Sequence, residues 1–264
     1  MKQWIIMTAK KRIGLALSGG GARGIAHIGV IQALEEQGIF PEVISGASAG
    51  AIVGALYAAG KKPGEIMDFV RKASFFKMFK VAIPFSGLTK LTYLRDKLAE
   101  TIPEDRFEAL EKQLFVAIAN LNTGECEMRS SGPLFDVVTA SSSIPLLFQP
   151  VDIDGQFYVD GGLLDNMPVG PLKGHCDISI AVNVMPHVPV SNKAVQNVIG
   201  IAQRCFDLSV LANSRPNIAL CDLLIEPKEV HSFNIFQLNR YEPLFDIGYS
   251  AAMEQMGALK ELIG

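Results

Sequence analysis

The chain has 264 residues, of which 49% are hydrophobic and 19% are charged, and its formal net charge is −3. This length suits one α/β domain with a buried core, so we expect a single domain over residues 1–264. The composition excludes a fibrous or disordered chain, and the charge gives no indication of nucleic-acid binding. No apolar run approaches the roughly 20 residues that cross a bilayer. The apolar stretch at residues 4–7 is too short for a signal peptide, and we expect a cytoplasmic protein.

The cysteines show no pattern typical of metal binding or disulfide pairing. Cys126, Cys176, Cys205 and Cys221 form no C-x-x-C pair and do not cluster with histidines in the sequence. We therefore expect four free, mostly buried thiols, with no metal site and no cofactor.

Apolar periodicity predicts strands that alternate with helices. Strands are expected at residues 13–18, 42–45, 114–121, 126–129, 178–184 and near 218–225, with a hairpin over 151–160. Helices are expected at 25–37, 49–59, 88–102, 194–211 and 243–262. This alternation is typical of a mostly parallel sheet that is covered on both faces.

The first motif is a glycine-rich loop between the first predicted strand and helix, with the sequence Ser18-Gly19-Gly20-Gly21-Ala22-Arg23-Gly24. Its glycines permit a sharp turn, and its amides lie at the positive end of a helix dipole, so the loop suits an anion. It also fits the dinucleotide fingerprint G-x-G-x-x-G. A dinucleotide site would place an acidic residue at the end of the second strand, where this chain has Gly46-Ala47-Ser48. A purely structural turn is a further alternative.

Arg23 is the one charged residue in this loop. It either holds an anionic headgroup or joins the loop to a neighbouring carbonyl, and we favour the second role.

The second motif is Gly46-Ala47-Ser48-Ala49-Gly50, between a predicted strand and a helix. It is a G-x-S-x-G sequence in the strand–turn–helix context of a nucleophile elbow. The alternative is that Ser48 only caps the following helix, since serine is a favoured N-cap residue.

The third motif is Asp160-Gly161-Gly162, directly after the predicted hairpin. A carboxylate followed by two glycines lies in a turn without bulky side chains. The alternative is an ordinary turn aspartate, as we expect for Asp152, Asp154 and Asp165.

The placement of the histidines bears on the choice between a catalytic pair and a triad. His27, His175, His187 and His231 all lie in settings that do not favour a role as the base of a serine triad. His27 and His175 stay open as alternatives, because histidine is the usual base.

Together the three motifs, in this order and at comparable spacing, resemble the patatin-like phospholipase family, in particular its short bacterial members. The segment Ala140-Ser141-Ser142-Ser143-Ile144-Pro145 also resembles the stretch that precedes the catalytic aspartate of that family. The resemblance covers residues 13–185. The predicted helical part over 190–264 matches no motif.

The resemblance implies a three-layer α/β/α sandwich and a hydrolase that acts on lipid esters such as phospholipids, lysophospholipids or neutral lipids. It implies that Ser48 is the nucleophile, that Asp160 is the base, and that the loop Gly19–Gly24 forms the oxyanion hole. Two alternatives are an acyltransferase that uses the same acyl-enzyme and a non-catalytic lipid-binding regulatory protein. The sequence does not indicate an oligomeric state.

The segment 61–85 is rich in both aromatic and basic residues. Phenylalanines at 69, 75, 76, 79 and 85 alternate with lysines and an arginine. Basic and aromatic side chains together suit a membrane surface, so we expect peripheral contact here, at the inner face of the membrane. The alternative is that the aromatic residues belong to the core. We favour that for Phe69, and a wall or cover of an acyl channel for 75–85.

Overall fold

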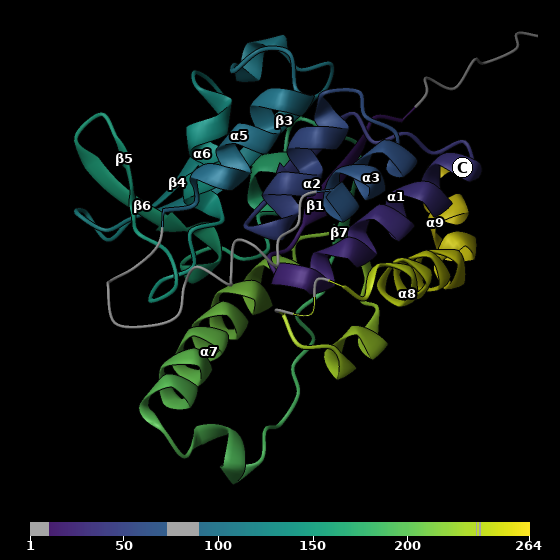
Figure 1. Ribbon diagram of the computed structural model, residues 1–264. Helices are drawn as coiled ribbons and strands as arrows, with labels where there is room; N and C mark the ends of the chain where they lie inside the picture. Colours follow the sequence, from purple (N-terminus) through teal and green to yellow (C-terminus); the bar gives the residue numbers. More distant parts are fainter. Residues whose placement is uncertain (1–10, 73–89, 236, 238) are drawn as a thin grey trace, which may run out of the picture.

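The fold is built on one mixed sheet whose strand order is β5-β6-β3-β2-β1-β7-β8, with β4 pairing with β3 (Figure 1). The computed structural model describes residues 11–72, 90–235, 237 and 239–264. The parallel strands are β1 (Ile13–Leu17), β2 (Val43–Gly46), β3 (Gln113–Asn120), β7 (Ile178–Val182) and β8 (Leu223–Ile225). Strands β4 (Cys126–Arg129) and β6 (Gln156–Asp160) run antiparallel to β3, and β5 (Val151–Ile153) forms a hairpin with β6.

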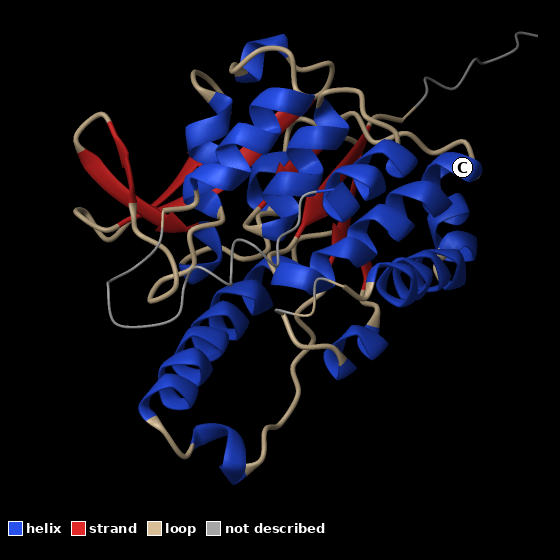
Figure 2. Cartoon of the chain, in the orientation of Figure 1, coloured by secondary structure: helices blue, strands red, loops and turns tan. Residues whose placement is uncertain are grey.

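Helices cover the sheet, most thickly on one face (Figure 2). The α-helices are α1 (Ile25–Glu36), α2 (Ala49–Ala58), α3 (Pro63–Lys72), α5 (Thr92–Thr101), α6 (Leu134–Ser141), α7 (Val198–Ile218), α8 (Tyr241–Glu254) and α9 (Met256–Ile263). Short 3-10 turns are η1 (Gly21–Gly24), η2 (Phe107–Ala109), η3 (Gly161–Leu163), η4 (Gly170–Leu172), η5 (Asn192–Val195) and η6 (Lys228–Ser232).

Alternate residues of the central strands face two different hydrophobic clusters. Leu15 and Leu17 belong to the larger cluster with α1, α2 and α8, whereas Ala16 belongs to a smaller cluster on the other face. The smaller cluster is completed by side chains of segment 167–172 and by the end of α7. Both faces of the sheet are therefore buried, which explains why the central strands are apolar along their whole length.

The sequence predicted this mixed α/β fold with a mostly parallel central sheet, and the predicted strands lie where expected. Helix α6 was not predicted, and the strand expected near 218–225 is confined to Leu223–Ile225. The helix expected at 194–211 runs instead from Val198 to Ile218, because Asn213 and Asn217 in its last two turns hydrogen-bond to the segment after Asp160. The helix expected at 243–262 is two helices that meet at Gln255.

The cysteine prediction is only partly right. All four thiols are free, but Cys126 and Cys205 are exposed, and Cys176 and Cys221 are half-buried. In the described part of the chain, no group of three or more His, Cys, Asp or Glu residues is placed to hold a metal ion. Among the same residues, no helix combines the length and apolar character that a membrane span requires.

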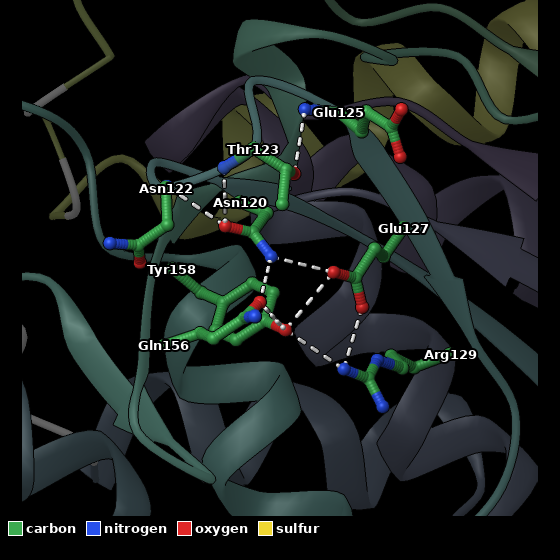
Figure 3. A network of polar contacts seen from close by, with 8 residues as sticks. All are labelled: Asn120, Asn122, Thr123, Glu125, Glu127, Arg129, Gln156 and Tyr158. Atoms are coloured by element: carbon green, nitrogen blue, oxygen red, sulfur yellow. Dashed lines mark hydrogen bonds and ion pairs between the residues drawn. The ribbon is translucent and has the colours of Figure 1, made fainter.

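A polar network of side chains joins β6 to β3 and β4 (Figure 3). Asn120, at the end of β3, is buried and donates to Glu127 of β4 at 2.8 Å, and its side chain also contacts Gln156 of β6. The Tyr158 hydroxyl of β6 donates to Glu127 and accepts from Arg129, both at 3.0 Å. Glu127 and Arg129 form an ion pair at 2.6 Å. Because buried polar groups cost free energy unless paired, this network fixes how β6 lies against β3.

We therefore predict that Tyr158→Phe lowers the free energy of unfolding by about 1 kcal/mol, since it leaves Glu127 and Arg129 without a shared partner. Urea denaturation measures the change. Tyr93→Phe is the matched control, because the Tyr93 hydroxyl makes no hydrogen bond to any residue that the structure describes. Equal stability of the Tyr158 variant and wild type would show that the network does not hold β6 in place.

Candidate active site

The three motifs meet at the carboxyl edge of the parallel strands. Leu17 pairs with both Gly46 and Val182, so β1, β2 and β7 end at the same level. Strand β3 continues beyond that level: its Val116 pairs with Gly46, and its Ile118 pairs with Asp160. Strand β6 therefore brings Asp160 to the end of β2, 112 residues after Ser48 in the chain. The edge of a sheet where parallel strands end is the usual place for a ligand site in such folds.

Ser48 lies in a strained turn between β2 and α2. Its φ is +52°, a conformation that non-glycine residues rarely adopt and that is typical of strained functional turns. The turn is possible because Gly46 and Gly50 lack side chains. A Cβ on Gly46 would lie 2.6 Å from the Gly50 carbonyl oxygen, and a Cβ on Gly50 would lie 2.2 Å from the Leu17 carbonyl oxygen. The tight strand–turn–helix geometry expected from the sequence is therefore present, and the role of Ser48 as a nucleophile stays a prediction.

The Ser48 hydroxyl faces Asp160. Its Oγ donates a hydrogen bond of 2.6 Å to Asp160 Oδ2, and Asp160 Oδ1 accepts from the Gly162 amide at 2.8 Å. The capping alternative is wrong, because the Ser48 side chain makes no capping hydrogen bond to α2. Asp160 does make the hydrogen bond of a turn aspartate through Oδ1, but its Oδ2 accepts from Ser48 and only 2% of the residue is exposed.

Burial changes the acidity of Asp160. Removal of water raises the pKa of its carboxyl to about 7, against the lowering effect of the hydrogen bonds from Ser48 and Gly162. A carboxylate with a pKa near neutrality is a much better base than an exposed one.

The serine-rich segment at the end of α6 holds both sides of this pair. The Ser48 amide donates to Ser141 Oγ at 2.9 Å, and the Asp160 amide donates to the Ser143 carbonyl at 3.0 Å. Ser142 Oγ lies 3.4 Å from the Ser48 carbonyl oxygen. The sequence indicated this segment only by its resemblance, because side-chain contacts across 93 residues leave no local signal.

The amides of the glycine loop divide into two groups. The Gly19 amide donates to the Asn166 carbonyl at 3.2 Å, the Ala22 amide to the Ile235 carbonyl at 2.7 Å, and the Arg23 amide to the Gly20 carbonyl at 3.2 Å. The amides of Gly20 and Gly21 donate to no residue in the described ranges. Gly24 is the last residue of η1 and precedes α1, and a Cβ on it would lie 2.5 Å from the Ala49 Cβ. Gly20 and Gly21 are thus the loop donors that remain available to an anion near Ser48.

Arg23 joins the glycine loop to the end of η6 and the residue that follows it. Its Nε donates to the Phe233 carbonyl at 2.8 Å, and one terminal nitrogen donates to the His231 carbonyl at 3.3 Å. These contacts agree with the structural role that we favoured for Arg23.

Asn166 was not identified from the sequence, although it lies among the three motifs. It is 2% exposed, its carbonyl accepts from Gly19, and its amide donates to Asn213 of α7 at 2.9 Å. Its side chain lies against both Gly19 and Gly162, and its Nδ2 has no partner among the described residues. Asn166 therefore joins the glycine loop, the Asp-Gly-Gly turn and α7. A polar residue six positions after the aspartate is the only signal that the sequence offered.

Neither of the suspected histidines reaches Ser48. His27 is fully buried, its Nε2 donates to the Ser18 carbonyl at 2.8 Å, and burial lowers its pKa to about 4. His175 lies against Phe115, on the other face of the sheet. In the described part of the chain, no histidine lines a pocket that contains Ser48.

An apolar pocket opens directly beside Ser48. Ala49 and the glycine loop form its base, and its walls are the apolar side chains of Ile25, Ile52, Val53, Val70, Leu91, Leu94, Ile144, Phe148 and Ile235. A second, smaller cavity is lined by Ser48, Asp160, Gly20, Gly21 and Asn166 together with Asp207 and Val210 of α7. An apolar pocket that ends at a few convergent polar groups is typical of a site for an amphipathic small molecule.

The basic, aromatic segment 61–85 is described only in part. Phe69 is 6% exposed and belongs to the core, as we favoured. Arg71 is half-exposed and forms ion pairs with Asp68 and Glu242. Residues 73–85 lie outside the described residues, so membrane contact through this segment stays a prediction.

Fold and site together define an α/β protein with a serine on a strand–turn–helix elbow, paired with a buried carboxylate. A family model described as patatin-like phospholipase matches residues 15–173. An NTE family protein of Mycobacterium tuberculosis, itself uncharacterised, is 33% identical over 181 residues, which cover 67% of this chain and 50% of that protein. The chain belongs to the patatin-like phospholipase family.

Two further similarities concern a longer enzyme and the fold. The lysophospholipase NTE1 of Saccharomyces cerevisiae is 36% identical over 179 residues, which cover 65% of this chain and 11% of the yeast protein. The chain thus spans half or less of the length of these relatives. The crystal structure of VipD from Legionella pneumophila superposes with a TM-score of 0.51 at 19% identity, over 95% of this chain and 67% of that one, which shows the shared fold.

The elbow geometry predicts that Gly50→Ala is strongly destabilising. The new Cβ would lie 2.2 Å from a carbonyl oxygen of the buried strand β1, and overpacking of this kind costs about 1–3 kcal/mol. Gly64→Ala in α3 is the control, because a Cβ there meets nothing within 4 Å and alanine favours the helix. Urea denaturation of both variants measures the difference. Equal unfolding free energies would contradict the close approach of β1 and α2.

Proposed function

We propose that this protein is a serine ester hydrolase of the lysophospholipase or phospholipase A type, with Ser48 as nucleophile and Asp160 as base. The observation that carries the proposal is the 2.6 Å hydrogen bond between their side chains, with Ser48 also lining an apolar pocket. The family and the lysophospholipase relative support an ester of a lipid as the substrate. An acyl chain fits the apolar pocket, because that pocket offers almost no hydrogen-bonding group apart from those beside Ser48.

In the first half of the reaction, Asp160 takes the proton from Ser48 Oγ as that oxygen forms a bond to the ester carbonyl carbon. Negative charge then develops on the carbonyl oxygen, where the amides of Gly20 and Gly21 are free to donate. Each well-placed donor of this kind contributes roughly 3 kcal/mol to transition-state stabilisation. The bond to the alcohol oxygen breaks, and the alcohol leaves with the proton that Asp160 holds.

In the second half, water attacks the acyl-enzyme. Asp160 takes a proton from the water as its oxygen bonds to the acyl carbon, and the proton passes to Ser48 Oγ as the ester bond to the enzyme breaks. The fatty acid is released, and the pair returns to its starting state. These steps require no metal or cofactor, since the protein supplies the nucleophile, base and oxyanion donors.

An acyltransferase would use the same acyl-enzyme, with an alcohol in place of water. The arrangement of Ser48 and Asp160 does not separate these two activities. It does argue against a non-catalytic lipid-binding protein, because a strained serine and a buried carboxylate both cost stability without a catalytic role.

Residues on both sides of the segment 73–89 in the sequence line the apolar pocket. Val70 before this segment and Leu91 and Leu94 after it all line the apolar pocket. Residues 75–85 lie outside the described residues, so the wall or cover of an acyl channel that we expect there stays a prediction.

Ser48→Ala should abolish ester hydrolysis and leave the fold intact, because it removes one small hydroxyl. Loss of a serine nucleophile lowers turnover by roughly 10⁶-fold in comparable enzymes. The assay uses p-nitrophenyl esters of graded chain length, followed by lysophospholipids. His175→Gln is the control and should keep activity within severalfold. More than a tenth of wild-type activity in the serine variant would exclude Ser48 as nucleophile.

The acidity of Asp160 predicts how activity and stability depend on pH. The base must be ionised, so kcat/KM should fall below about pH 7. The folded-state pKa of about 7 lies above the ordinary 3.8, so the folded protein keeps a proton that the unfolded chain releases. The resulting contribution to stability is complete below about pH 4 and is lost as the pH rises through 7.

Asp160→Asn removes this pH dependence and should be more stable than wild type at pH 8, with a smaller difference at pH 5. Thermal denaturation at the two pH values measures it. A rate profile with its acidic limb near pH 4, or a stability difference that does not change with pH, would contradict the buried carboxylate as the base.

A further inference from the structure

A polar cavity continues from the small cavity at Ser48 on the side away from the acyl pocket. The two cavities share Met185, Asp207 and Val210 as lining residues. Helix α7 forms their common wall, and it extends away from the sheet in Figure 1. The small cavity at Ser48 therefore adjoins two sites that differ in chemistry: the apolar pocket, which Ser48 also lines, and the charged cavity.

The charged cavity contains two arginines and one carboxylate, so it carries one net positive charge when its histidines are neutral. Arg23 and Arg204 line it together with Asp207, His187 and His231. Burial raises the pKa of the Asp207 carboxyl above its ordinary value, against the lowering effects of the Gln203 hydrogen bond and the charges of Arg204 and Arg23. The Asp207 carboxylate also accepts from Gln203 at 2.9 Å.

The two arginines differ in how their guanidinium groups are used. Arg23 already donates to the carbonyls of Phe233 and His231, so its contribution to a ligand is mainly its charge. Arg204 is half-buried on α7, and among the described residues it makes neither a hydrogen bond nor an ion pair within 4 Å. A half-buried guanidinium with free donors beside a cavity suits bidentate binding of a phosphate or carboxylate.

We propose that this cavity, with Arg204 as its main contact, binds the phosphate of a phosphate-bearing headgroup while the acyl chain of the same molecule occupies the apolar pocket. The inference rests on the proposed function, since it places the ester at Ser48, between the apolar pocket and the charged cavity. A phosphate is favoured over a carboxylate because an acyl ester of glycerol carries its charged group on the alcohol side, and there that group is a phosphate. Arg204 is then a specificity-determining residue and takes no part in the chemical step.

The test compares two substrates with the same acyl chain: a monoacylglycerol and the corresponding lysophosphatidylglycerol. Arg204→Gln should raise KM for the phosphate-bearing ester by roughly ten- to hundredfold, the usual effect of losing a charged hydrogen bond. Hydrolysis of the monoacylglycerol should change less than twofold. Arg215→Gln on the same helix is the matched control, because Arg215 is exposed and lines neither cavity.

A second variant should change the substrate preference in the opposite direction. Asp207→Asn removes the only carboxylate that lines the cavity among the described residues, so the preference for the phosphate-bearing ester over the neutral one should increase. This variant keeps the proposal testable if Arg204→Gln is unstable. An equal effect of either variant on both substrates would overturn the proposal.

Two further experiments distinguish a phosphate-bearing headgroup from free phosphate as the ligand of the cavity. Glycerol 3-phosphate should inhibit hydrolysis of the lysophospholipid competitively in wild type and much less in Arg204→Gln. Inorganic phosphate at the same concentration should have little effect on p-nitrophenyl ester hydrolysis. If inorganic phosphate alone changes that activity through Arg204, the cavity is a site for free phosphate and the headgroup proposal is wrong. If no substrate is hydrolysed by wild type, the proposed function itself fails, independently of the cavity.

Discussion

The position of Asp160 relative to Ser48 depends on the register in which β2 and β6 pair with β3. Gly46 pairs with Val116 and Asp160 pairs with Ile118, so two residues of one strand separate the elbow from the carboxylate. A shift of β6 by one residue would turn the Asp160 side chain to the other face of the sheet, because side chains alternate along a strand. The hydrogen-bonded network of Asn120, Glu127, Arg129 and Tyr158 prevents that shift. The 2.6 Å contact at Ser48 is thus a consequence of sheet register as much as of the two residues themselves.

Burial of Asp160 is the second condition that the proposed Ser48–Asp160 chemistry requires. An exposed aspartate is a weak base at neutral pH, whereas the pKa of Asp160 is raised to about 7. The groups that stabilise its charge are few: the Ser48 hydroxyl and the Gly162 amide. His27 is close to the glycine loop in sequence, but its buried, neutral ring supports the loop through the Ser18 carbonyl.

Much of this arrangement is predictable from the sequence, and the limits have physical causes. The three glycine-containing motifs are local signals, because tight turns and close backbone contacts require glycine at fixed positions. Their convergence follows from parallel strands that end at one edge. Asn166 and Ile235 have no such signal, and only the resemblance indicated Ser141, since each contributes through contacts with distant segments. The extent of α7 was also underestimated, because its last turns are held by Asn213 and Asn217 rather than by apolar periodicity. Its position gives the site a charged side that no sequence motif indicated.

The central claim is that Asp160 activates Ser48, and the rate of covalent labelling tests it most directly. A fluorophosphonate reacts with an activated serine in a single step, independently of lipid binding or product release. Mass spectrometry of wild type should locate one label on Ser48, and Asp160→Asn should react at least a hundredfold more slowly while keeping the wild-type circular dichroism spectrum. Labelling of another residue, or equal rates in the two proteins, would contradict the account.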